Sequence, residues 1–308
     1  MDSELFHNRS LGSCLKDALD LYRTNFRTIF RRLWLPVLVM SLLLSSVMMI
    51  ELSHPNMSSP SNLSISWGTS LFSFVLYIAS IAVSIWIVSI IVSLLNGKSM
   101  KVNLPRIARL FLLLIGVAVV VCVLLGLGIY ANYSSIKGPE QLKNANMKLL
   151  LSSALFTIVI IVAFLPLVFS CMKYCIEPDG KVASIFKRPY IVGFRHWGFL
   201  FLIVLLTELI AMVFNMFFYL PLCIIFLCYF LNDSGIAIGD LSGLPGAFGI
   251  LAFIIGTGSM FLSLFVRPWM LFSYYYAYGC IEEKEKARKK QKETKIPQVD
   301  NVDFEEVR

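Results

Sequence analysis

The chain has 308 residues, 57% of them hydrophobic and 15% charged, and its formal net charge is +8. Soluble domains contain about 25% charged residues and are less than half apolar, so this composition excludes an ordinary soluble domain. The positive charge does not indicate nucleic-acid binding, because the basic residues are dispersed among the segments between apolar runs.

Six apolar runs are long enough to cross a hydrocarbon core, which takes about 20 helical residues for a thickness of roughly 30 Å. They are residues 33–50, 70–95, 110–130, 149–171, 198–220 and 247–266. We therefore predict an all-α, polytopic membrane helix bundle with six transmembrane helices. It forms a single membrane domain over residues 1–280, followed by a charged and disordered cytoplasmic tail over residues 281–308.

The segment before the first apolar run is predicted to be an amphipathic helix over residues 11–32. Its apolar residues recur every three or four positions and so share one face, namely Leu11, Leu15, Ala18, Tyr22, Phe26 and Ile29. Basic residues crowd its end, at Arg23, Arg27, Arg31 and Arg32. Such a helix lies among anionic lipid headgroups, where we expect it to orient the chain or to dock a protein partner.

A similar basic segment precedes the fifth run and contains Lys187, Arg188 and Arg195. We predict a second amphipathic cytoplasmic helix there, whose cations also contact lipid headgroups. Most of the 27 basic residues lie in segments on one side of the predicted membrane. The positive-inside rule then places both the N-terminus and the C-terminus in the cytoplasm.

The fifth apolar run is longer than one crossing requires. It continues from Gly198 to Leu231, about 50 Å as a helix. Because Pro221 interrupts it, we expect the span to end near Leu220 and Leu222–Leu231 to form a bent or re-entrant piece. The alternative is that this piece extends the span.

Aromatic residues are concentrated directly after the last span. Tryptophan and tyrosine are enriched at the boundary between hydrocarbon and headgroups. The sequence therefore predicts an interfacial belt made of Trp269, Tyr274, Tyr275, Tyr276 and Tyr278.

The sequence contains none of the fingerprints of phosphate-binding loops, serine hydrolases or zinc peptidases. Cys171 and Cys175 would share one helix face, but two thiols are half of a tetrahedral zinc site. His7, His54 and His196 lack the spacing of metal ligands. We therefore predict no enzymatic activity, no cofactor and no catalytic or metal-binding residue.

Glu208 is the ionisable side chain that lies well inside a predicted span. An acid at the bilayer centre costs about 3 kcal/mol, so such residues usually face the bundle interior. The low polarity of the bilayer favours the protonated form of such an acid. Asn215 follows two turns later on the same face. These two residues form our candidate intramembrane polar site, which serves either helix packing or proton-coupled transport.

Two stretches carry a resemblance to known proteins: LKDALDLYRTNFRTIFRRLWLPVLV near the N-terminus and FSYYYAYGCIEEKEK after the last span. With the six-span layout, they resemble a group of bacterial six-helix membrane proteins similar to the membrane domain that precedes some glycerophosphodiester phosphodiesterases. The resemblance implies a membrane module without the phosphodiesterase domain, and it transfers no catalytic residue. It also implies location in the cytoplasmic (inner) membrane of a bacterium.

Two functions from different classes fit the sequence. The first is a non-enzymatic scaffold or accessory subunit that binds a protein partner or a second copy of the chain. The alternative is a small carrier or lipid-handling permease that uses Glu208 as a protonatable site. A cavity near Glu208 is expected for the permease and is not needed by the scaffold.

Overall fold

The computed structural model describes residues 5–52, 67–134, 139–177, 180–239 and 243–295. Within these ranges six helices are long and apolar enough to cross a membrane. They are α3 (Phe26–Leu52), α4 (Trp67–Asn96), α5 (Met100–Ser134), α6 (Pro139–Ile176), α8 (Trp197–Ala237) and the continuous run of α9 (Phe248–Leu264) into α10 (Val266–Lys295). The prediction of an all-α chain with six such helices is confirmed.

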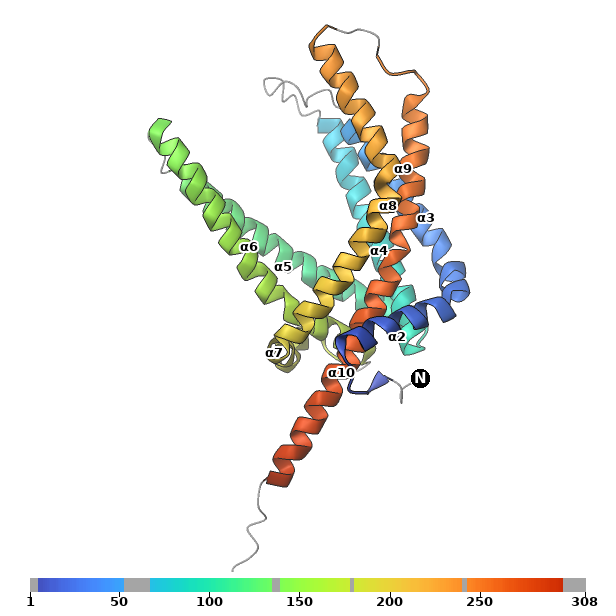
Figure 1. Cartoon of the computed structure of the whole chain (residues 1–308), viewed down its shortest axis with the longest axis vertical. Helices are drawn as coiled ribbons and strands as arrows, with labels where there is room; N and C mark the ends of the chain where they lie inside the picture. Colours follow the sequence, from blue (N-terminus) through green and yellow to red (C-terminus); the bar gives the residue numbers. More distant parts are fainter. Residues whose placement is uncertain (1–4, 53–66, 135–138, 178–179, 240–242, 296–308) are drawn as a thin grey trace, which may run out of the picture.

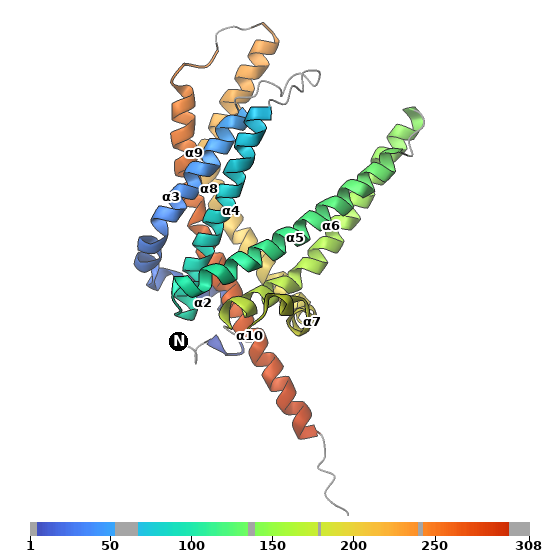
Figure 2. The same cartoon turned by 180° about the vertical axis from the view of Figure 1, so that it is seen from behind.

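The helices form a V when the molecule is viewed from the side. One arm contains α3, α4, α8 and α9, and the other is the hairpin of α5 and α6 (Figures 1 and 2). The arms meet near α7 (Arg188–Arg195) and diverge toward the opposite end. Only 6% of the most apolar stretch of α5 is buried in the protein, so this arm presents its hydrophobic residues to its surroundings.

The predicted helix over residues 11–32 is divided into two helices. α2 (Leu11–Thr24) begins after Ser10, whose hydroxyl accepts a hydrogen bond from the Ser13 amide at 3.3 Å. It ends at Asn25, whose side-chain amide donates to the Leu21 carbonyl at 3.0 Å. This capping lets the chain turn, so α2 lies across the end of the bundle while α3 rises along it (Figure 1).

The expectation of a re-entrant piece after Leu220 is wrong. α8 is one helix of 41 residues with Pro221 inside it. Proline removes one helical hydrogen bond, but long membrane helices tolerate this loss because the turns on both sides remain paired. Leu222 and Ile225 are buried, so the segment after the proline packs against the bundle as a continuation of the same helix.

The predicted aromatic belt is also wrong for three of its members. Trp269, Tyr275 and Tyr278 are only 6%, 7% and 2% exposed, because α10 passes through the centre of the protein. The helix continues to Lys295, so the part of the expected disordered tail up to that residue is helical. The rest of the tail, residues 296–308, lies outside the described residues.

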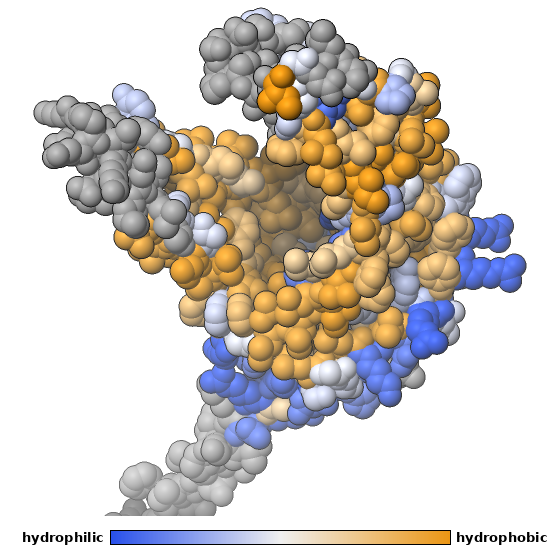
Figure 3. Space-filling view, turned by 45° about the horizontal axis from the view of Figure 1, so that its top comes forward, coloured by the Kyte–Doolittle hydropathy of each residue, from blue (hydrophilic) through white to orange (hydrophobic). Residues whose placement is uncertain are grey.

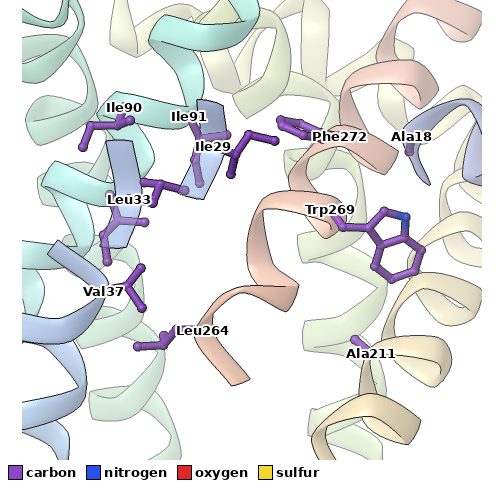
Figure 4. Close-up of a cluster of buried hydrophobic side chains, with 11 residues drawn as sticks. Ala18, Ile29, Leu33, Val37, Ile90, Ile91, Ala211, Leu264, Trp269 and Phe272 are labelled. Atoms are coloured by element: carbon purple, nitrogen blue, oxygen red, sulfur yellow. The ribbon is translucent and has the colours of Figure 1, made fainter. Parts of the chain in front are cut away.

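The main hydrophobic core lies where α3, α4, α9 and α10 meet. Ile29 and Leu33 of α3 pack in one cluster with Ile91 of α4, and Leu264 and Phe272 complete it from the C-terminal side (Figure 4). This packing holds α10 inside the arm that contains α3 and α4. The position of α10 in turn brings Tyr274 next to α8.

The second basic segment forms a 3-10 helix, η1 (Val182–Phe186), followed by α7. Gly193 in α7 approaches α6 so closely that an added Cβ atom would lie 2.7 Å from the Pro166 carbonyl oxygen. The glycine is therefore what lets α7 pack against α6.

Candidate intramembrane site around Glu208

Glu208 lies on α8 at the edge of the contact between α8 and α10. Its neighbours Thr207 and Ala211 are 0% and 1% exposed, whereas the Glu208 side chain is exposed. The hydroxyl of Tyr274 on α10 donates a hydrogen bond to Glu208 Oε1 at 3.3 Å. The acid is thus anchored at one oxygen and open to its surroundings at the other, rather than sealed inside a helix contact.

Asn215 faces a different helix. Its Oδ1 accepts a hydrogen bond of 2.8 Å from the Ser263 hydroxyl of α9, which also lies 2.9 Å from the Tyr219 hydroxyl. Glu208 and Asn215 therefore share a face of α8, as the spacing predicts, but they contact α10 and α9 separately. Asn215 serves a helix contact, while Glu208 keeps an exposed carboxylate.

A hollow lies between the two arms of the V. Figure 3 shows it from the open end, with walls of predominantly hydrophobic residues. α8 borders this hollow on one side and an apolar groove beside α2 on the other. Ile210, Phe214 and Phe218, which line that groove, lie about 160°, 120° and 80° around α8 from Glu208. Glu208 is therefore not among the described residues that line the groove, and it lies to one side of them on α8.

Six of the seven predicted headgroup contacts are exposed without a described ion pair: Arg23, Arg27, Arg31, Arg32, Lys187 and Arg188. Arg195 differs, because its guanidinium lies 3.0 Å from Glu285 on α10. A contact of Arg195 with a lipid headgroup therefore competes with its ion pair to Glu285. The other six basic side chains are exposed, which is compatible with lipid binding.

A charged network that sequence reasoning missed joins α10 to the ends of α6, α7 and α8. Glu285 is 8% exposed. Its carboxylate accepts a hydrogen bond from the Arg195 guanidinium at 3.0 Å, and its other oxygen lies 3.1 Å from the His196 Nε2 atom. Lys173 of α6 pairs with Glu282 one turn earlier. Alternating charge at residues 282–288 is the one signal of this network in the sequence.

No group of three or more metal-binding side chains is present in the part of the chain that the structure describes. Cys171 and Cys175 instead pack in a hydrophobic cluster with Ile107 and Ile185. Elsewhere, Cys14 of α2 meets Cys280 of α10, and a hydrogen bond between these thiols, together with burial, raises the pKa of Cys14.

Tyr22 shows how firmly α2 is attached. Its hydroxyl donates to the Phe265 carbonyl at 3.0 Å, at the junction between α9 and α10. Burial raises the pKa of Tyr22 to about 12. The tyrosine is thus neutral at physiological pH and serves as a hydrogen-bond donor that fixes the end of α2.

No protein-family model, curated protein or solved structure matches this chain. The resemblance to bacterial six-helix membrane proteins therefore stays a prediction.

Proposed function

We propose that this multi-pass membrane protein is a non-enzymatic, lipid-handling permease in a bacterial inner membrane, with Glu208 as its protonatable site. The observation that carries the proposal is the exposed Glu208 side chain, hydrogen-bonded to Tyr274, within a helix long and apolar enough to cross a membrane. A carboxylate retained at such a depth is a functional-site hypothesis by default, because burying it in hydrocarbon is costly.

The chemistry of the hollow favours lipid over a water-soluble substrate. Its walls are hydrophobic and it opens sideways between the arms, toward the space that lipid occupies in a membrane (Figure 3). A water-soluble solute would need a continuous polar path to reach Glu208. A lipid can instead bring its headgroup to Glu208 while its chains stay in hydrocarbon, so the cost of dehydrating the headgroup falls.

Glu208 would assist the movement of the lipid headgroup by changing its own charge. In its ionised form it binds a cationic group or accepts hydrogen bonds from a headgroup, and in its protonated form it releases them. The Tyr274 hydroxyl holds one carboxylate oxygen in both cases, so the other oxygen is the one that meets the headgroup. No bond in the lipid is made or broken.

Reconstitution into vesicles tests this function. Vesicles carrying fluorescent phospholipid should lose the fluorescence of both leaflets to an external reductant when the protein is present, and of one leaflet when it is absent. Glu208→Gln should slow the exchange at least about tenfold, the scale of removing one functional polar contact. No exchange with the native chain would end the proposal.

Glu51→Gln is the matched control for that experiment. Glu51 also accepts a hydrogen bond from a tyrosine, Tyr77 at 2.9 Å, but at the far end of α3. The Glu51→Gln substitution should leave the lipid exchange unchanged.

A hydrophobic carbodiimide that labels protonated carboxyls should modify Glu208 in membranes, and labelling should fall as the pH rises. Glu208 that resists labelling at every pH would indicate a sealed contact instead.

A second function is favoured by the α5–α6 hairpin. The apolar stretch of α5 is only 6% buried, which leaves a long hydrophobic face for a partner helix. A scaffold or accessory subunit would use this face and would tolerate Glu208→Gln. Crosslinking from residues on α5 in native membranes distinguishes the two functions, because a scaffold gives a defined protein adduct and a permease gives adducts with lipid.

A further inference from the structure

The apolar groove beside α2 has the shape and polarity of a hydrocarbon site. Its volume is about 620 Å³, and it is bounded by α2, the start of α3, α8, α9 and α10. Its walls include Leu15, Tyr22, Phe26, Phe30, Phe214 and Trp269. Lys16 is the one charged residue among the described residues that line it. A groove of this kind in a membrane takes an acyl chain, which buries apolar surface without dehydrating any polar group.

A basic depression adjoins the groove through Phe30, a residue that lines both. Arg27, Arg31 and Arg32 lie around the depression, and no acidic residue is present among the described residues that line either surface. Guanidinium groups bind phosphate oxygens through paired, charge-assisted hydrogen bonds. The two surfaces therefore offer hydrocarbon on one side of Phe30 and an anion site on the other.

The depth of these surfaces matches the two ends of a phospholipid. The arginines lie in the first turns of α3, where the chain rises from α2, and Trp34 lies beside them, as is typical of the headgroup boundary. Phe30 stacks on Phe265, and Phe265 contacts Phe261 one turn earlier on α9, so the groove extends away from the arginines along α9. Figure 3 shows the same order, with hydrophobic residues above a hydrophilic lower rim.

We propose that the groove and the basic depression form one binding site for a single anionic phospholipid of the leaflet that contains α2. An acyl chain occupies the groove, and the phosphate binds Arg27 and Arg31. The indole N–H of Trp269 has no acceptor among the described residues, although Trp269 is 94% buried and lines the groove. The Nε1 atom itself is buried, so the acyl chain contacts the Trp269 ring and not its N–H.

The bound lipid acts as a fixed part of the structure. It lies between α2 and the helices α8 and α9, so it adds to the attachment that Tyr22 already provides. Trp269 extends from α10 toward the helices that carry Ala18 and Ala211, which places it at the junction the lipid would fill (Figure 4). Glu208 is not among the described residues that line either surface, so the site is tested separately from lipid transport.

Native mass spectrometry of the purified full chain tests the site. With phosphatidylglycerol and phosphatidylcholine of identical chains, one phosphatidylglycerol should stay bound selectively. Arg27→Gln with Arg31→Gln should weaken retention about 30-fold, since each basic residue near the surface contributes about a fivefold effect. Both arginines are exposed, so the double substitution removes no packing inside the protein.

Lys187→Gln with Arg188→Gln is the matched control. It removes two exposed positive charges that line neither surface, and it should leave the phosphatidylglycerol adduct intact. Two outcomes would show that the charges attract lipid without forming a site. The first is equal retention of the two lipids by the native chain, and the second is an equal loss of bound phosphatidylglycerol in the two double variants. A polypeptide that occupies the groove in place of lipid would overturn the proposal as well.

Fluorescence locates the acyl chain independently. Phosphatidylglycerol with brominated chains should quench tryptophan emission more than brominated phosphatidylcholine does, and Trp269→Phe should remove this difference. A difference that persists in Trp269→Phe would place the selective lipid elsewhere. Trp34→Phe controls for quenching at the exposed tryptophan beside the depression, and it should retain the part due to Trp269.

Discussion

The hydroxyl of Tyr274 on α10 lies 3.3 Å from Oε1 of Glu208 on α8, two residues separated by 66 positions in the chain. The pair links two helices that are also joined through buried side chains, since Ile203 of α8 packs with Ala277 of α10. Glu208 thus has a structural partner and an exposed face at once. This combination suits a site that must keep its position while it exchanges protons or ligands.

The energy of this contact should be measurable with a double-mutant cycle. Glu208→Ala, Tyr274→Phe and the combination should show a coupling of about 1 kcal/mol in the free energy of unfolding, typical of hydrogen bonds between membrane helices. Unfolding by sodium dodecyl sulfate in mixed micelles gives the three values. If the two single effects simply add, the hydroxyl does not hold the carboxylate.

Gly193→Ala should lower the free energy of unfolding by about 1 to 3 kcal/mol, because the new methyl group would overlap the backbone of α6 at Pro166. Gly198→Ala serves as the control, since an added Cβ there meets no atom within 4 Å. It should stay within about 0.5 kcal/mol of the native chain. Equal effects of the two substitutions would mean that α7 does not pack tightly on α6.

Glu285→Ala should lower the free energy of unfolding by about 2 kcal/mol and increase amide exchange in α7. It removes the acceptor for Arg195 and His196, but the Arg195 side chain is 43% exposed and regains water, so the loss is smaller than for a fully buried pair. Glu283→Ala, which removes an acid without an ion pair among the described residues, should change neither quantity. Unaltered exchange in α7 after Glu285→Ala would contradict the network.

Pro221→Ala should raise the free energy of unfolding by about 1 kcal/mol, because the new amide can donate to the Phe217 carbonyl within α8. Pro221 is exposed, so the substitution costs no protein contact. Circular dichroism should show no loss of helix. A fall in both stability and helix content would instead favour a turn at this proline.

The errors of sequence reasoning at Pro221 and at the aromatic residues have a common physical cause. Local rules treat a proline as a helix break and a tyrosine as an interfacial residue, because they assume that water or lipid surrounds each residue. Inside the bundle, neighbouring helices replace those solvents. Tyr278 is 2% exposed and donates to Glu177, directly after α6, at 3.2 Å, a partner 101 positions away that no local pattern reveals.

The sequence by itself determined the number of apolar helices and their approximate positions, because the thickness of a bilayer sets the length of each hydrophobic run. It also identified Glu208 as an unusual acid. Only the tertiary structure decided that Glu208 is exposed beside Tyr274, that Asn215 belongs to a separate contact, and that Glu285 joins Arg195. Those outcomes depend on how helices pack, and packing brings together residues whose spacing along the chain carries no trace of their contact.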